Sequence, residues 1–171
     1  LFGLFRDRRH KRKLANRIII DDSSRLVELF TGKKIKRMDL IADNFGHELV
    51  SDLYLIDYLL RQGFVNQVYV HLKDKPYLVS DALIKDVFLL IKRLQRDLSP
   101  IAQDFAGRLE TYLKEEKLIL KDNSFWTTPQ AFIDMPSDLM WDFVRSDFAL
   151  IKGDLNYCKL IDCLYWPYNS R

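Results

Sequence analysis

Short apolar runs alternate along this chain with longer segments in which apolar residues recur every three or four positions. The short runs have the length of strands, and the longer segments have the spacing of amphipathic helices. The predicted strands are residues 17–22, 38–42, 65–72, 117–121 and 147–151. The predicted helices are residues 25–30, 48–61, 82–98, 100–116 and a short one that begins at Pro136.

Residue types typical of helix ends agree with these boundaries. Gly63 follows the helix of residues 48–61 and is placed to end it. Ser80 and Asp81 have N-cap chemistry ahead of residues 82–98. Because strands alternate with helices, we expect an α/β protein, a three-layer α/β/α fold around a mostly parallel, Rossmann-like sheet.

Polar side chains follow three of the predicted strands. Asp43 and Asn44 come directly after residues 38–42, residues 80–81 follow the third strand, and residues 152–154 follow the last one. The carboxyl ends of parallel strands meet at one edge of a sheet, which is where ligands bind in open α/β folds. We therefore expect these three polar clusters to lie close together.

Asp43, Asn44 and Asp81 are the candidate metal ligands. Carboxylate and amide oxygens are hard ligands, suited to Mg²⁺ or Mn²⁺. Three such groups would leave open positions for water and for a phosphate oxygen. The pattern alone leaves an alternative open, in which Asp43 and Asn44 form an Asx turn and Asp81 caps a helix.

Other polar residues near the strand ends allow two interpretations each. Gly153 would let backbone approach a ligand, and Lys152 would supply a point charge for phosphate, but a turn and a solvated strand end explain them as well. His47 and Glu48 could reach the site, or could begin the helix, where a glutamate favours the helix dipole. We expect His10 and His71 to be structural or solvated.

The composition indicates a folded protein without a membrane segment. The chain has 171 residues, 48% of them hydrophobic, and no apolar run approaches the roughly 20 residues that cross a bilayer. We expect a soluble protein of the cytoplasm, or of the nucleus as well. Cys158 and Cys163 have no matching partners for a zinc site, and we expect two reduced thiols, with a disulfide as the alternative.

The net charge of +3 conceals an asymmetry. The first 37 residues carry 12 Lys and Arg against 4 Asp and Glu, whereas the remainder carries 15 against 20. We interpret residues 1–16 as a basic arm at a truncated edge, ahead of a metal-binding domain at residues 17–171. The arm lacks the interleaved aromatics of a single-strand binder, so its best functional use is to attract phosphate-bearing substrates.

Four stretches in this order resemble one family. They are Asp43-Asn44-x-Gly-x-Glu, Pro76-Tyr77-x-Val79-Ser80-Asp81, Ser124-Phe125-Trp126-Thr127 and Lys152-Gly153-Asp154-Leu155-Asn156-Tyr157. Together they are similar to the metal-dependent damage-control phosphatases, once called domain of unknown function 89. The most similar subgroup is also named for acidic-residue (protein-glutamate) methyltransferase activity. The similarity extends from about residue 17 to residue 167.

The resemblance implies an α/β/α fold that holds a divalent metal, typically Mn²⁺, Co²⁺ or Ni²⁺. It assigns the metal to Asp43, Asn44 and Asp81, with Asp43 and Asn44 also catalytic. It assigns substrate binding to Lys152, Asp154, Leu155, Asn156 and Tyr157. Members of the family hydrolyse sugar phosphates such as fructose 1-phosphate. We accordingly expect a phosphatase of small phosphorylated metabolites that acts as a monomer, without nucleic-acid or membrane partners.

This chain departs from the family pattern at several places. Cys158 stands where the subgroup has an arginine, and the subgroup's N-terminal helical region and its later Arg-Thr-x-Lys motif are missing. One alternative is therefore a catalytically impaired relative that serves as a metal-binding or interaction domain. Another is protein-glutamate O-methyl transfer, although no glycine-rich loop for a methyl donor is visible.

Overall fold

The computed structural model describes residues 20–167, and the chain divides into two compact units between Lys33 and Lys34. In the first unit the described residues form helix α2 (Ser23–Gly32). The strand predicted at residues 17–22 is wrong for residues 20–22, where Ile20 is 78% exposed and the chain is irregular. The Asp21 carboxylate instead accepts the backbone N–H of Ser23 at 3.0 Å, which suits a helix start. The basic arm lies outside the described residues.

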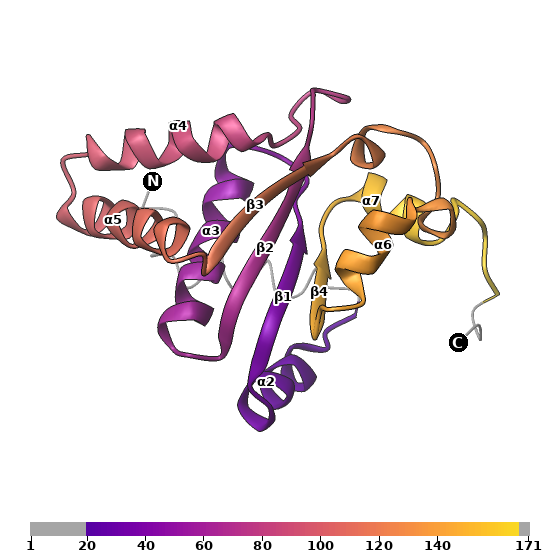
Figure 1. The fold of residues 1–171 in the computed structure, drawn as a ribbon, viewed down its shortest axis with the longest axis horizontal. Coiled ribbons are helices and arrows are strands. Elements are labelled where there is room, and N and C mark those ends of the chain that lie inside the picture. Colours follow the sequence, from indigo (N-terminus) through magenta and orange to yellow (C-terminus); the bar gives the residue numbers. More distant parts are fainter. Residues whose placement is uncertain (1–19, 168–171) are drawn as a thin grey trace. The chain divides into compact units, whose positions relative to one another are not determined.

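The second unit is built on a four-stranded parallel sheet (Figure 1). Its strands are β1 (Ile35–Ile41), β2 (Val65–Lys73), β3 (Leu118–Asn123) and β4 (Phe148–Ile151), in the order β3-β2-β1-β4. Leu40 of β1 is in register with Val70 on one side and with Leu150 on the other. The predicted parallel α/β fold is confirmed.

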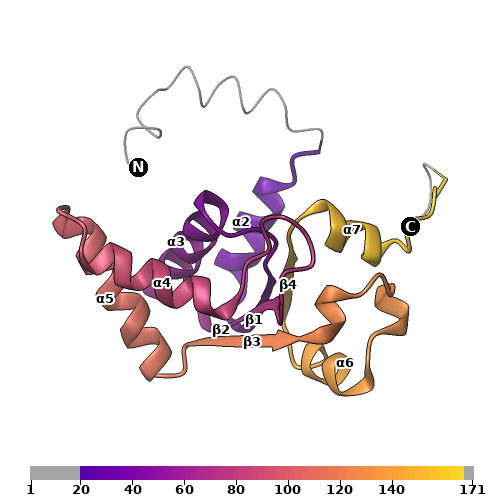
Figure 2. The ribbon, with the colours of Figure 1, turned by 90° about the horizontal axis from the view of Figure 1, so that it is seen from above.

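Helices cover both faces of this sheet. They are α3 (His47–Arg61), α4 (Ile84–Gln95), α5 (Pro100–Lys114), α6 (Ser137–Phe143) and α7 (Asp154–Leu160). Figure 2 shows α3 and α4 on one side of the sheet and α6 on the other. Within the described part of the chain, no helix is long and apolar enough to cross a membrane.

The start of α4 differs from the prediction that Ser80 or Asp81 caps it. The residue before the helix is Leu83, whose backbone N–H donates to the Asp86 carboxylate at 2.9 Å. Residues 81–83 are extended instead, because Asp81 pairs with Asn44 and Leu83 pairs with Lys73 as isolated bridges. The pairing keeps Asp81 at the sheet edge rather than at the helix end.

The aromatic segment that follows β3 forms a core on the α6 side of the sheet. It contains two 3-10 turns, η2 (Ser124–Thr127) and η3 (Phe132–Asp134). Phe125 and Trp126 are each 1% exposed and pack with Ile41 of β1 and Leu139 of α6. The segment lies between the strand predicted at residues 117–121 and the helix predicted from Pro136, and its side chains fill the interior.

Charged residues of β1 and β2 are buried in pairs. Asp39 is fully buried and accepts two hydrogen bonds from Arg37, at 2.7 and 2.8 Å. Its Oδ1 atom is also hydrogen-bonded to His71 Nε2 at 2.7 Å. Burial alone would raise the pKa of Asp39, but the bonds from His71 and Arg37 lower it. His71 is therefore structural, as predicted.

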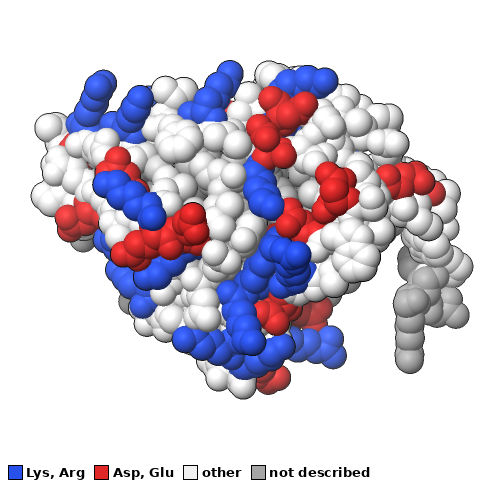
Figure 3. Space-filling model, in the orientation of Figure 1, with Lys and Arg blue, Asp and Glu red and all other residues white. Residues whose placement is uncertain are grey.

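Figure 3 shows acidic and basic side chains interspersed on one outer face as well.

Candidate metal centre

The ends of β1 and β2 are joined by backbone pairing between residues 43–45 and 80–82. The Ala82 N–H donates to the Asp43 carbonyl at 2.9 Å, and the Phe45 N–H donates to the Ser80 carbonyl at 2.8 Å. Asn44 and Asp81 are thus opposite each other in an antiparallel bridge. Two of the polar clusters predicted to meet at one sheet edge do so.

The side chain of Asn44 is held at both ends of its amide. The Nδ2 group donates to Asp43 Oδ2 at 2.7 Å and to Glu48 Oε2 at 3.2 Å. The Oδ1 atom accepts the hydroxyl of Ser80 at 2.6 Å. The carboxylates of Asp43 and Glu48 need a donor, so the Asn44 nitrogen must face them. The Asn44 oxygen is therefore the atom that can act as an acceptor or a metal ligand.

Asp81 is 6% exposed and is surrounded by donors. It accepts the Lys73 ammonium at 3.2 Å through Oδ1 and the backbone N–H groups of Tyr77 and Leu78 through Oδ2. Burial raises the pKa of Asp81, but these donors outweigh it and the pKa lies below its usual value. Asp81 is therefore ionised at neutral pH.

Asp43 is the carboxylate on which negative charge concentrates. It is 8% exposed, and burial raises its pKa above the usual value. Lys73 lowers the pKa, whereas the charges of Glu48, Asp154 and Asp81 raise it further. A cation bound here would relieve this repulsion, because carboxylates that face one another favour a bound positive charge.

Gly153 brings the last strand exit against Asp43. Its φ is +86°, and a β-carbon added there would lie 2.2 Å from the Asp43 carboxylate carbon. A side chain is therefore excluded both by the left-handed backbone and by the contact. The glycine does allow a close approach, as the sequence suggests, and the group that it approaches is a predicted metal ligand.

Lys152 lies beside this contact but is already paired. Its ammonium donates to Asp52 at 2.7 Å and lies 3.0 Å from Glu48. Burial would lower the pKa of Lys152, but the two carboxylates raise it. Lys152, which we predicted to supply a positive charge for phosphate, is thus half-buried and forms ion pairs that join the end of β4 to α3.

The candidate substrate segment at the start of α7 presents both buried and exposed residues. Asn156 is fully buried and donates to the Lys152 carbonyl at 2.7 Å, and its Oδ1 has no hydrogen-bond partner within residues 20–167. Tyr157 is 60% exposed, and Asp154 is exposed and accepts the Leu155 N–H at 2.9 Å. The segment therefore offers a carboxylate and a phenol to solvent.

Known proteins resemble this chain over nearly its whole length. The model of the "Damage-control phosphatase ARMT1-like domain" matches residues 5–171. The chain belongs to this family. Proteins named damage-control phosphatase ARMT1 are 34% identical in Danio rerio over 165 residues (90% of this chain, 37% of the relative) and 32% identical in Homo sapiens over 162 residues (89% and 37%). The protein of that name in Xenopus laevis is 35% identical over 142 residues (81% and 32%).

The chain spans about a third of the length of these relatives. The resemblance inferred from the four motifs is confirmed at the level of the family. The motifs at residues 43–48, 76–81 and 152–157 all lie at the sheet edge described above, and the motif at residues 124–127 forms η2.

Two cysteines of the chain correct the sequence prediction. Cys158 and Cys163 form a disulfide with an S–S distance of 2.04 Å, so the expected reduced thiols are wrong. The chain turns back directly after α7, with Asp162 and Cys163 at positive φ, and this turn brings the two sulfurs together. Cys158, where the subgroup has an arginine, is thus a bonded residue.

Sequence reasoning missed Lys73, the basic residue that holds the candidate ligand Asp81. Lys73 is 1% exposed, although a lysine at a strand end ordinarily indicates a solvated residue. Within residues 20–167, no group of three or more His, Cys, Asp or Glu converges as a metal site. The candidate donors are two carboxylates and an amide. His47 is exposed at the start of α3, and His10 lies outside the described residues.

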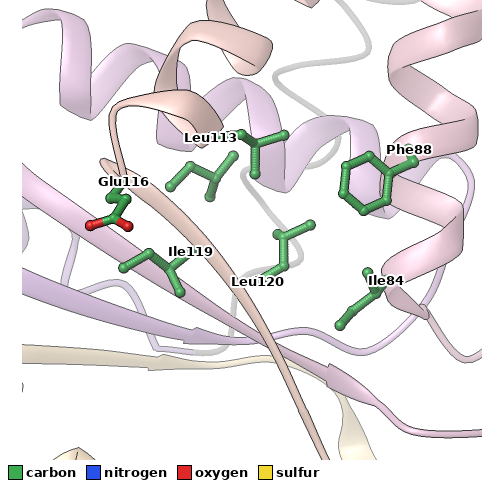
Figure 4. Close-up of a pocket in the computed structure, with 7 residues that line it drawn as sticks. Ile84, Phe88, Leu113, Glu116, Ile119 and Leu120 are labelled. Atoms are coloured by element: carbon green, nitrogen blue, oxygen red, sulfur yellow. The ribbon is translucent and has the colours of Figure 1, made fainter.

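A separate hollow lies between α4, α5 and β3 (Figure 4). Ile84 and Phe88 of α4 face it on one side, with Leu113 and Leu120 on the other. Its lining is apolar apart from Glu116. It therefore lacks the donors that a phosphorylated ligand needs.

Proposed function

We propose that this chain is the metal-binding core of a phosphatase that hydrolyses small phosphorylated metabolites, with sugar phosphates such as fructose 1-phosphate as first candidates. The observation that carries the proposal is the buried Asp43 carboxylate among Asn44, Glu48, Asp81 and Asp154 at the carboxyl edge of the sheet. The name shared by the relatives supports the reaction class.

The donor set suits a hard divalent cation. Asp43, Asn44 and Asp81 would hold it through oxygen atoms, which Mn²⁺ and Mg²⁺ prefer and which Co²⁺ and Ni²⁺ also accept. The acidic neighbours of Asp43 support this assignment, since the charges of Glu48, Asp154 and Asp81 beside it are ones that a cation would balance. When bound, the cation would supply charge neutralisation and polarisation of a phosphoryl oxygen.

The residues around these ligands fix their orientation before any substrate arrives. Lys73 and two backbone N–H groups hold the Asp81 carboxylate, and Ser80 with Glu48 holds the Asn44 amide. Preorganised groups lose little energy on reorientation during the reaction. We assign to Asp43 the step at the phosphorus, as nucleophile or as the group that positions water.

The start of α7 would contact the rest of the metabolite. Asp154 and Tyr157 are exposed there and can accept or share hydrogen bonds with sugar hydroxyls. Leu155 and the buried Asn156 would position this segment rather than bind directly. Since Lys152 is paired with Asp52 and Glu48, phosphate binding would depend on the metal and on the hydroxyl that Tyr157 presents at the start of α7.

The test is release of phosphate from fructose 1-phosphate by the 171-residue chain with Mn²⁺ or Co²⁺. We expect Asp43→Ala to lower the rate by about 100-fold or more, since several kcal/mol of charge stabilisation depends on the metal. Asp104→Ala, at an exposed position of α5, is the matched control and should keep the wild-type rate. Equal rates for Asp43→Ala and wild type would exclude the proposed function.

A second candidate is a family member that binds metal without turnover. It is favoured by Cys158, which is held in a disulfide where the subgroup has a guanidinium. This candidate predicts Mn²⁺ binding by calorimetry that Asp43→Ala abolishes, together with no phosphate release from any sugar phosphate. The two candidates are separated by measuring both quantities on the same preparation.

A further inference from the structure

A buried lysine on α7 connects the candidate substrate segment to the aromatic turn η2. Lys159 is 2% exposed, and its ammonium donates to the carbonyls of Phe125 at 2.6 Å and Thr128 at 3.0 Å. The ammonium also lies 3.9 Å from the ring centroid of Phe125 and 5.8 Å from that of Trp126. Lys159 thus contacts Phe125 twice, once at its backbone carbonyl and once at its ring.

This arrangement is costly for the folded protein. Burying an ammonium costs several kcal/mol unless it is paired, and in the described part of the chain its contacts are carbonyls and ring faces rather than a carboxylate. Burial lowers the pKa of Lys159 to about 8, to which the charge of Lys73 contributes. An apolar side chain would fill the same space at lower cost but could not hold two carbonyls.

The η2 turn is attached on its other side to the end of β2. The hydroxyl of Thr127 donates to Asp74 at 2.7 Å, and Asp74 follows Lys73, which holds Asp81. The turn is further fixed by the Asn123 side chain, which accepts the Phe125 N–H at 2.8 Å. One rigid turn therefore contacts both the strand end behind Asp81 and the helix that carries Tyr157.

We infer that Lys159 is a positioning residue, which fixes α7 on η2 so that the segment 154–157 stands at a set distance from Asp43 and Asp81. The inference rests on the proposed function, because it gives that segment a phosphorylated ligand. It also assigns a role to the Ser124–Thr127 motif, which touches none of the candidate metal ligands in the contacts described above. In this inference the η2 turn determines the position of α7, and Lys159 holds the helix to the turn.

The experiment measures Mn²⁺ affinity and then affinity for inorganic phosphate with Mn²⁺ bound, both by calorimetry on the full chain. In Lys159→Met we expect the Mn²⁺ dissociation constant to stay within about twofold and the phosphate dissociation constant to rise about tenfold or more, as for misplaced supporting groups. Lys159→Arg, which can still reach both carbonyls, should restore most of the phosphate affinity. A role in stability alone would not separate the two affinities.

Two outcomes overturn the inference alone. They are wild-type phosphate affinity in a folded Lys159→Met protein, and a parallel loss of Mn²⁺ and phosphate affinity. A wild-type protein that binds Mn²⁺ but no phosphate would instead overturn the proposed function, and the inference with it. If Lys159→Met does not fold, Thr127→Val releases η2 from Asp74 on the opposite side and should show the same selective loss of phosphate affinity.

Discussion

Gly153 lies directly against Asp43, so that a β-carbon on the glycine would stand 2.2 Å from the carboxylate carbon. The two residues belong to the exits of neighbouring strands, β4 and β1. This contact places the backbone at the start of α7 beside the carboxylate to which we assign the chemistry. It also makes the candidate metal centre sensitive to a single methyl group.

Replacing Gly153 with alanine should damage the site more than the fold. The methyl group would collide with Asp43, and φ of +86° adds a backbone cost of about 1–3 kcal/mol. We expect Mn²⁺ affinity, measured by calorimetry, to fall about tenfold or more. Gly107→Ala is the matched control, since nothing lies within 4 Å of its β-carbon in α5, and it should stabilise the protein by about 0.5–1 kcal/mol.

Removing the Lys73 ammonium should leave a buried carboxylate unpaired. We expect Lys73→Met to lower the free energy of unfolding by about 3–5 kcal/mol, measured by urea denaturation, because the side chains of Lys73 and Asp81 are each 1% exposed. Adding Asp81→Asn should recover part of the loss. Lys75→Met, at an exposed position nearby, serves as control. A Lys73→Met protein as stable as this control would contradict the pairing.

In alkaline solution, the way the free energy of unfolding changes with pH should depend on Lys159. Its folded-state pKa of about 8 lies below its ordinary value of 10.5, so between these values the unfolded chain binds more protons than the folded one. The unfolding free energy should therefore rise with pH across this window, by about 1–3 kcal/mol more in the wild type than in Lys159→Met. Denaturation curves at pH 7.5, 9 and 10.5 measure the difference. Parallel pH profiles would show that Lys159 titrates normally.

The disulfide predicts how the cysteines react. Without reductant, an alkylating reagent in denaturant should label neither Cys158 nor Cys163, and after reduction it should label both, as counted by mass spectrometry. Because the bond closes a short loop, we expect its loss in the double Cys→Ser variant to cost about 1–2 kcal/mol. Labelling of two thiols before reduction would restore the original sequence expectation.

The elements that the sequence predicts well are those with long, regular apolar spacing. Helix α3 and strand β2 agree with prediction within one residue at each end, because periodicity and Gly63 determine them locally. The strand predicted at residues 17–22 is wrong for residues 20–22, because apolar character alone does not specify a partner strand. Asp81 shows the same limit, since its local pattern suits a helix cap and only the bridge to Asn44 makes it part of the site.

The site residues that the sequence did not reveal are those whose burial depends on distant segments. Lys73 and Lys159 have the side chains of surface residues, and their partners lie in other parts of the chain. Asp52 similarly belongs to α3 but pairs with Lys152 of the β4 exit. Such pairings follow from the order of strands in the sheet, which local spacing does not encode.

The chain passes from β3, at one edge of the sheet, to β4 at the other edge, and this crossing affects how the candidate site folds. Asp43 follows the first strand and Gly153 follows the last, so their contact closes a loop of about a hundred residues, which is costly in chain entropy. The candidate centre is thus complete only once β4 has docked beside β1. Metal added during refolding should stabilise that last stage by mass action, and the appearance of high-affinity binding should mark the end of folding.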